Sequence, residues 1–109
     1  MKTMAMRAFV LGLAVLFVAA PAVLQERAQL LAEGKKLFTT QGCYGCHTIG
    51  VVGTPIAPDL SHVGLKYPES YIERWLRDPL FQKPTAHMPK ITLTEVEVRA
   101  LASFLGSLQ

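Results

Sequence analysis

The chain has 109 residues, which leaves room for one domain. Half of the residues are hydrophobic and 17% are charged, with 11 basic and 8 acidic side chains. There is no long basic run and no patch in which aromatic and basic residues alternate, so the composition argues against a nucleic-acid-binding protein.

The first 24 residues predict an export leader. Lys2 and Arg7 give it a positive start, and an unbroken apolar run follows from Ala8 to Ala20. The next small residues, Ala20-Pro21-Ala22, are typical of a cleavage site. One interpretation is therefore a signal peptide that is cut after Ala22.

A retained membrane anchor is the other interpretation of residues 1–24. The apolar run can be extended to Leu24, and as a helix its 17 residues would span about 26 Å, against about 30 Å of hydrocarbon core. In both cases the basic start stays in the cytoplasm, so residues 25–109 lie on the outer, periplasmic side of the membrane.

A helix is predicted from about Leu24 to Thr40, because apolar residues recur there at helical spacing: Leu30, Leu37 and Phe38. Gly34 lies in the same pattern and would allow another helix to approach closely.

The most informative motif follows this helix, in Cys43-Tyr44-Gly45-Cys46-His47. C-x-x-C-H is the attachment site of a c-type haem, in which the two sulfurs bind the two vinyl groups of one porphyrin. The imidazole of His47 then falls under the iron as the proximal ligand. The motif predicts one covalent haem c, held through Cys43 and Cys46.

Two other uses of the cysteine pair stay open. A thioredoxin-like dithiol belongs near a βαβ pattern, which this chain lacks. A closed zinc site needs four ligands, and Cys43 and Cys46 are the only cysteines. His62 and His87 would have to complete it at an unusual spacing.

Two helices and a stiff loop make up the second half. Pro68 suits the first turn of a helix that runs to about Arg77, and Pro79 prevents its extension. The last helix has the sequence of a capping box, Thr94-Glu95-Val96-Glu97, followed by an apolar stripe that begins at Val98. No strand pattern persists, so we expect an all-α fold.

Met88 lies on the loop between these helices, flanked by Pro84 and Pro89. The other three methionines all fall within the first six residues, so Met88 is the only one in the body of the chain. Its thioether is placed to bind the iron opposite His47, although a core-filling methionine is the alternative. A second histidine ligand, His62 or His87, is a further alternative.

Together these features resemble a class I cytochrome c, over residues 25–109. They are a helix with Gly34 and Phe38, the C-x-x-C-H motif, Ala57-Pro58-Asp59-Leu60, a helix with Trp75, and Met88-Pro89 before the last helix. The family commonly has glycine where this chain has Ala57.

The resemblance implies a small helical fold around one haem with histidine and methionine ligands. The first and last helices would cross, with Gly34 against Phe104 or Leu105. Pro58 would offer its carbonyl to Nδ1 of His47, and Trp75 would place its indole nitrogen near a haem propionate. An ordinary core aromatic is the alternative for Trp75.

The distribution of charge along the chain bears on the kind of redox partner that it would bind. Without Lys2 and Arg7, nine basic side chains face eight acidic ones, but residues 34–58 and 79–94 contain no acid. These segments should surround the exposed haem edge, and they carry Lys35, Lys36, Lys83 and Lys90. A basic rim there would attract an acidic redox partner.

The sequence therefore predicts a one-electron carrier that works between redox proteins, is not an enzyme and binds no small-molecule substrate. The first alternative is a membrane-anchored haem c protein fixed in a respiratory or photosynthetic complex. A haem peroxidase or gas sensor, in which Met88 does not bind the iron, ranks below both.

Overall fold

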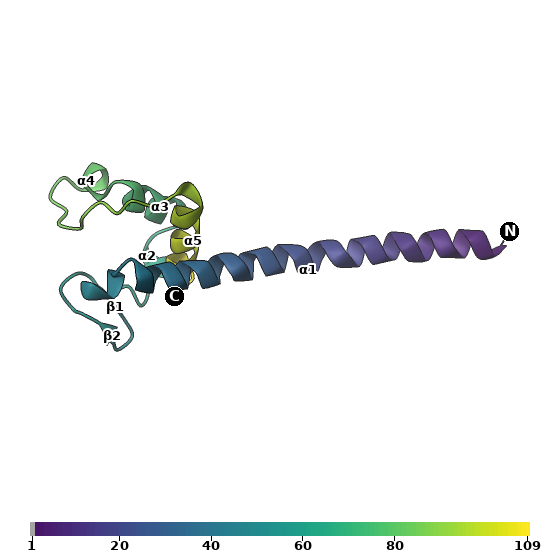
Figure 1. The fold of residues 1–109 in the computed structure, drawn as a ribbon, viewed down its shortest axis with the longest axis horizontal. Helices are drawn as coiled ribbons and strands as arrows, with labels where there is room; N and C mark the ends of the chain where they lie inside the picture. Colours follow the sequence, from purple (N-terminus) through teal and green to yellow (C-terminus); the bar gives the residue numbers. More distant parts are fainter. Residues whose placement is uncertain (1) are drawn as a thin grey trace.

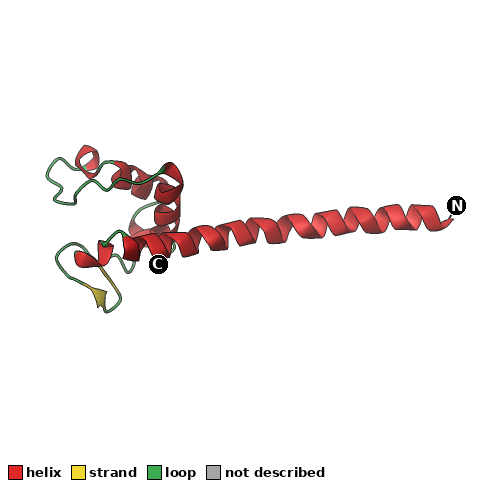
Figure 2. Cartoon of the chain, in the orientation of Figure 1, coloured by secondary structure: helices red, strands yellow, loops and turns green. Residues whose placement is uncertain are grey.

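The protein is described by a computed structural model, which gives the backbone of residues 2–109 and the side chains of residues 21–109. The order of elements is α1 (Lys2–Thr40), η1 (Cys43–Gly45), β1 (Thr48–Ile49), β2 (Val52–Gly53), α2 (Val63–Lys66), α3 (Glu69–Arg77), α4 (Pro79–Gln82) and α5 (Glu95–Gly106). Helices make up most of the domain, which confirms the predicted all-helical class (Figures 1 and 2).

The crossing of α1 and α5 is the centre of the fold (Figure 1). Gly34 of α1 lies against the backbone of α5: a Cβ atom here would overlap the carbonyl oxygen of Ala100 and lie 2.7 Å from Cβ of Phe104. The predicted contact between Gly34 and Phe104 is therefore present, and glycine is required because the two backbones meet.

The core is built mainly on α5. This helix contributes six of the ten buried hydrophobic side chains among the residues described: Val98, Ala100, Leu101, Ala102, Phe104 and Leu105. Leu37 and Phe38 reach it from α1, and Ile72 and Leu76 reach it from α3. Three helices thus share one apolar centre.

The start of α5 has the predicted capping box. The Thr94 hydroxyl accepts a hydrogen bond from the Glu97 backbone N–H at 3.2 Å, and the Glu97 carboxylate accepts one from the Thr94 N–H at 2.9 Å. These bonds satisfy backbone donors that a helix start leaves unpaired. They also fix where the loop with Met88 ends.

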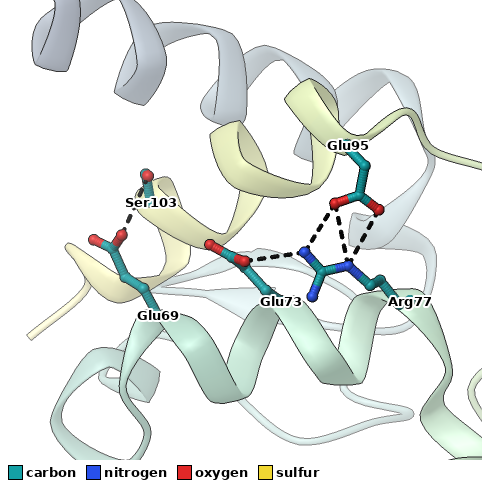
Figure 3. A network of polar contacts seen from close by, with 5 residues as sticks. All are labelled: Glu69, Glu73, Arg77, Glu95 and Ser103. Atoms are coloured by element: carbon teal, nitrogen blue, oxygen red, sulfur yellow. Dashed lines mark hydrogen bonds and ion pairs between the residues drawn. The ribbon is translucent and has the colours of Figure 1, made fainter.

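Polar contacts hold α3 against the other two helices, and Figure 3 shows those between α3 and α5. Arg77 donates to Glu73 within α3 and to Glu95 at the start of α5, at 3.1 and 2.9 Å. At the other end of α3, Arg27 of α1 donates to Glu69 at 2.5 Å and to the buried Ser103 hydroxyl at 3.2 Å. The Ser103 hydroxyl in turn donates to Glu69 at 3.3 Å.

The loop after η1 contains a small antiparallel hairpin that the sequence analysis does not predict. Thr48 pairs with Gly53 and Ile49 with Val52. The chain reverses at Gly50, whose φ of 61° is one that glycine adopts readily. Strands of two residues are too short to show the alternation by which a strand is recognised.

Two predicted helix bounds agree with the structure closely. The helix with Trp75 begins at Glu69, one residue after Pro68, and ends at Arg77. Asp78 then caps α4 by accepting a hydrogen bond from the Phe81 N–H at 3.3 Å. The short α4 stands between α3 and the loop with Met88.

The leader falls mostly outside the described side chains, which begin at residue 21. Within the part that is described, no helix has both the length and the apolar composition that a membrane span requires.

Candidate functional site

The two cysteines lie at the two ends of one short helical turn. Cys43 begins η1 and Cys46 follows its last residue, while the backbone N–H of His47 donates to the Cys43 carbonyl at 2.9 Å. Cys43 is half-buried and packs on the core, and this burial raises the pKa of its thiol. Cys46 is exposed. The turn therefore presents two sulfurs from one compact segment.

His47 has one ring nitrogen engaged and one left for another partner. Its Nδ1 lies 2.7 Å from the Pro58 carbonyl oxygen, the contact that the sequence resemblance implies. Because a carbonyl only accepts, Nδ1 carries a proton, and in the neutral imidazole Nε2 then keeps its lone pair. That tautomer is the one required of a metal ligand through Nε2.

Asp59 holds the segment that carries Pro58, and the sequence analysis assigns it no role. Its Oδ1 accepts hydrogen bonds from the Ser61 hydroxyl at 2.6 Å, the Ser61 N–H at 3.1 Å and the Thr48 hydroxyl at 3.1 Å. The Ser61 hydroxyl also accepts from the Gly50 N–H at 2.7 Å. These bonds tie residues 48–50 to residues 59–61, on both sides of the His47 and Pro58 contact.

Hydrogen bonding also sets the charge state of this carboxylate. The Ser61 hydroxyl and N–H lower the pKa of Asp59, with smaller contributions from Thr48 and His62. Asp59 is thus ionised at neutral pH. The donors to Asp59 are Ser61 and Thr48, which lie two and eleven residues away in the sequence. They form no recognisable motif, so the sequence alone does not predict this role.

Met88 lies half-buried on its loop and packs against the core. The indole nitrogen of Trp75, on α3, donates a hydrogen bond to its sulfur at 3.1 Å. The sequence resemblance implies a haem propionate as the partner of this nitrogen, and that role stays a prediction. The indole is placed by the packing of α3, which no spacing rule reveals.

The two histidines that are the alternative ligands are placed differently. His87 is exposed, although its neighbour Met88 is half-buried. His62 is exposed too, and it precedes α2 on the chain segment that also holds His47. Across residues 21–109, no three His, Cys, Asp or Glu side chains gather in a way that could hold a metal ion. The described side chains therefore do not form the alternative zinc site.

The side chains present suit a covalent haem. Two thiols, one imidazole with a free Nε2 and one thioether are the donor set that such a group requires. The segments that carry His47 and Met88 both project from the same end of the helical core (Figure 1). Both also expose large apolar side chains: Val51, Val52, Ile56, Leu80 and Phe81.

The four lysines of the acid-free segments are all exposed. Lys35 and Lys36 lie in the last two turns of α1, just before the cysteine motif, while Lys83 and Lys90 flank Met88 on its loop.

Comparison with known proteins shows three relatives that are parts of larger assemblies. The chain is 31% identical to cytochrome c oxidase subunit 2 of Alkalihalophilus pseudofirmus over 98 residues, which are 81% of this chain and 29% of that protein. It is 28% identical to a nitric oxide reductase subunit of Stutzerimonas stutzeri, over 73% of this chain and 59% of that one. It is 32% identical to the equivalent nitric oxide reductase subunit of Paracoccus denitrificans, over 69% and 56%.

The chain thus spans less than two thirds of the length of each of these relatives. The family model of cytochrome c matches residues 31–109, which include the whole cysteine motif, the loop with Met88 and the crossing of α1 with α5. Taken with the fold and the donor set, this match places the chain in the cytochrome c family.

Proposed function

We propose that this protein carries single electrons between redox proteins, on one haem c bound through Cys43 and Cys46 with His47 and Met88 as its axial ligands. When bound, the haem supplies an iron that alternates between Fe(III) and Fe(II). The observation that carries the proposal is the 2.7 Å contact between His47 Nδ1 and the Pro58 carbonyl, directly after the two cysteines. This contact leaves Nε2 of His47 free, which is the nitrogen that would bind an iron ion.

Each side chain has a distinct task in this proposal. The two thiols fix the position of the group, and the Pro58 carbonyl keeps the His47 ring in one orientation and one tautomer. The Met88 thioether is a soft ligand that favours Fe(II) and so raises the reduction potential. With both axial positions filled, no site remains for a substrate, which is why we propose a carrier and not an enzyme.

Replacement of Met88 is the direct test. We expect Met88→Ala to abolish the sulfur-to-iron charge-transfer band of the oxidised protein and to lower the potential substantially. His87→Ala is the matched control, since His87 is adjacent and exposed, and it should leave both properties unchanged. An unchanged band in Met88→Ala would refute the methionine ligand, and a loss of low-spin character in His87→Ala would favour the bis-histidine alternative.

The cysteines test covalent attachment separately. Cys43→Ser and Cys46→Ser should each remove one thioether bond and reduce the yield of mature protein. Normal amounts of fully linked haem protein in both variants would overturn the haem assignment itself.

A fixed place in a membrane complex is the second candidate function. It is favoured by the relatives, which are named as subunits of cytochrome c oxidase and nitric oxide reductase. In that case the haem domain would relay electrons within an assembly instead of diffusing. Co-purification of the chain with an oxidase or reductase activity, stable to high salt, would support this candidate over a free carrier.

The location proposed is the periplasmic side of the cytoplasmic membrane, on the basis of residues 1–24. An intact mass of the native protein distinguishes the two forms of the leader. A soluble species that carries haem mass and lacks the leader would be a diffusing carrier. A membrane species that keeps residues 1–24 would be anchored, and haem protein found only in the cytoplasm would refute the location.

The redox partner is proposed to be acidic at its docking face. Lys35, Lys36, Lys83 and Lys90 are exposed on the two segments that hold the haem ligands, and electrostatic attraction of this kind weakens with salt. Lys83→Glu should slow electron exchange with the partner and reduce its salt dependence. Lys66→Glu makes the same charge change outside these segments and serves as the control.

A further inference from the structure

The N-terminal part of α1 extends beyond the helical core (Figure 1). The helix is buried at Gly34, Leu37 and Phe38, whereas every residue from 21 to 29 is exposed. This exposed stretch is nevertheless part of one continuous helix that reaches Thr40. Hydrophobic packing therefore does not explain how the stretch is held in line with the domain.

One side chain of the exposed stretch reaches back to the domain. Arg27 donates to both carboxylate oxygens of Glu69, at 2.5 and 3.5 Å, and to the Ser103 hydroxyl at 3.2 Å. The Ser103 hydroxyl donates to Glu69 at 3.3 Å (Figure 3). These contacts close a ring that joins α1, α3 and α5. We call the three residues the Arg27 clamp.

The two partners of Arg27 are themselves held by α5. Ser103 is 2% exposed and is the one polar side chain among the buried residues of 21–109, and a buried hydroxyl requires hydrogen-bond partners. Glu69 lies over Gly106, where a Cβ atom would come within 2.6 Å of its Cγ. The clamp thus ties the exposed stretch of α1 to two side chains that the core positions.

The clamp lies just after a change of polarity along α1. Val23 and Leu24 are exposed although both are large and apolar, and they end the apolar run of the leader. The chain turns polar at Gln25, and Arg27 lies about 4.5 Å beyond Leu24 along the helix axis. Exposed apolar residues that continue an apolar run mark a place that lipid can cover.

We propose that the Arg27 clamp fixes the direction in which the haem domain stands on the membrane. This inference rests on the anchored form of the proposed function, in which residues 1–24 are retained. The ends of α3 and α5 that carry Glu69 and Ser103 then lie nearest the lipid. The cysteine motif follows the other end of α1, about 24 Å from Leu24 along the helix axis.

A fixed direction would serve a relay within an assembly. Electron transfer depends steeply on the distance between the two redox centres, and a domain that already points toward its partner loses less orientational freedom when it docks. Arg27 and Glu69 are both partly exposed, so their ion pair contributes little to global stability. Loss of the clamp should therefore change orientation much more than unfolding.

The experiment measures haem orientation in the full chain, reconstituted into stacked, oriented bilayers. A low-spin Fe(III) haem has anisotropic g values, so its EPR spectrum changes with the angle of the bilayers to the field when all domains share one tilt. Arg27→Ala removes the clamp. Lys35→Ala is the matched control, because Lys35 is an exposed cation of the same helix that forms no ion pair within residues 21–109.

We expect a strong angular dependence for wild type and Lys35→Ala, and the loss of most of it for Arg27→Ala. Equal dependence in Arg27→Ala and wild type would overturn the inference, and so would a wild-type spectrum that does not change with angle. Native protein without residues 1–24 would overturn it too, but would leave a soluble carrier intact. A wild-type protein without low-spin haem would instead refute the proposed function.

Hydrogen exchange tests the clamp without relying on the haem signal. The backbone N–H groups of residues 25–30 lie where α1 lacks buried side chains, so they exchange through local opening. In Arg27→Ala they should exchange roughly fivefold faster, with no change at residues 98–105 of α5. Alanine favours a helix at least as well as arginine, so helix propensity cannot cause this acceleration. Equal rates in Arg27→Ala and Lys35→Ala would overturn the inference.

Discussion

Gly34 in α1 lies directly against the carbonyl oxygen of Ala100 in α5, so that no side chain fits between the two helices. This contact sets the distance at which the first and last helices cross. The cysteine motif begins three residues after α1 ends, and the loop with Met88 leads directly into α5. The crossing therefore determines how the two proposed ligand segments are placed with respect to each other.

Gly34→Ala should lower the free energy of unfolding by about 1–3 kcal/mol, because the added methyl group meets backbone atoms that cannot turn aside. The intrinsic helix preference of alanine over glycine acts in the opposite direction, by about 1 kcal/mol. Urea unfolding of the haem protein measures the change, and equal midpoints for Gly34→Ala and wild type would contradict the close crossing.

Thr94→Ala should cost about 1 kcal/mol, because the hydroxyl that caps the Glu97 N–H is removed. Thr92, which is exposed two residues earlier in the chain, provides the matched control Thr92→Ala. The midpoint of thermal unfolding should be clearly lower for Thr94→Ala than for Thr92→Ala. If both lost the same stability, the cap would not be the cause.

Asp59→Ala should loosen the loop that holds the Pro58 carbonyl against His47, since one carboxylate oxygen accepts three hydrogen bonds there. The lowered pKa of Asp59 fixes the sign of its pH dependence. Its contribution to stability is complete above the ordinary pKa of an aspartate and is lost as the pH falls through the lowered value.

Asp59→Asn separates charge from hydrogen bonding, because an amide oxygen can still accept. We expect Asp59→Asn to be close to wild type at pH 7 and to lack the acid-induced loss that Asp59 contributes. We expect Asp59→Ala to be less stable than wild type at pH 7, with a difference that narrows as the pH falls. Denaturant unfolding between pH 3 and 7 makes the comparison. Parallel pH curves for wild type and both variants would show that Asp59 does not support this loop.

Arg77→Lys should weaken the attachment of α3 to α5, because an ammonium group cannot reproduce the forked contact with Glu95. The same hydrogen bonds lower the pKa of Glu95, so this stabilisation is present above the ordinary pKa of a glutamate and declines as the pH falls through the lowered one. These side chains are exposed, so the effect should be smaller than that of Thr94→Ala and should shrink in 1 M salt. A loss that did not change with salt would point to packing instead of charge.

Features that depend only on residues close together in the sequence could be predicted without the tertiary structure. C-x-x-C-H is a chemical unit of five residues, and a capping box spans four, so both are complete within a short stretch. The bounds of α3 follow from Pro68 and Pro79 for the same reason, since proline acts on its own backbone. The family could also be predicted from the sequence, because its motifs follow one another in a fixed order.

Pairings between distant side chains emerged from the packed structure alone. The indole of Trp75 donates to Met88, Asp59 binds Thr48, and Arg27 joins Glu69 to Ser103. Each of these pairs depends on how the helices cross and how the loops return to them. The hydrophobic packing that sets those directions is spread over the whole core, and no local pattern records it.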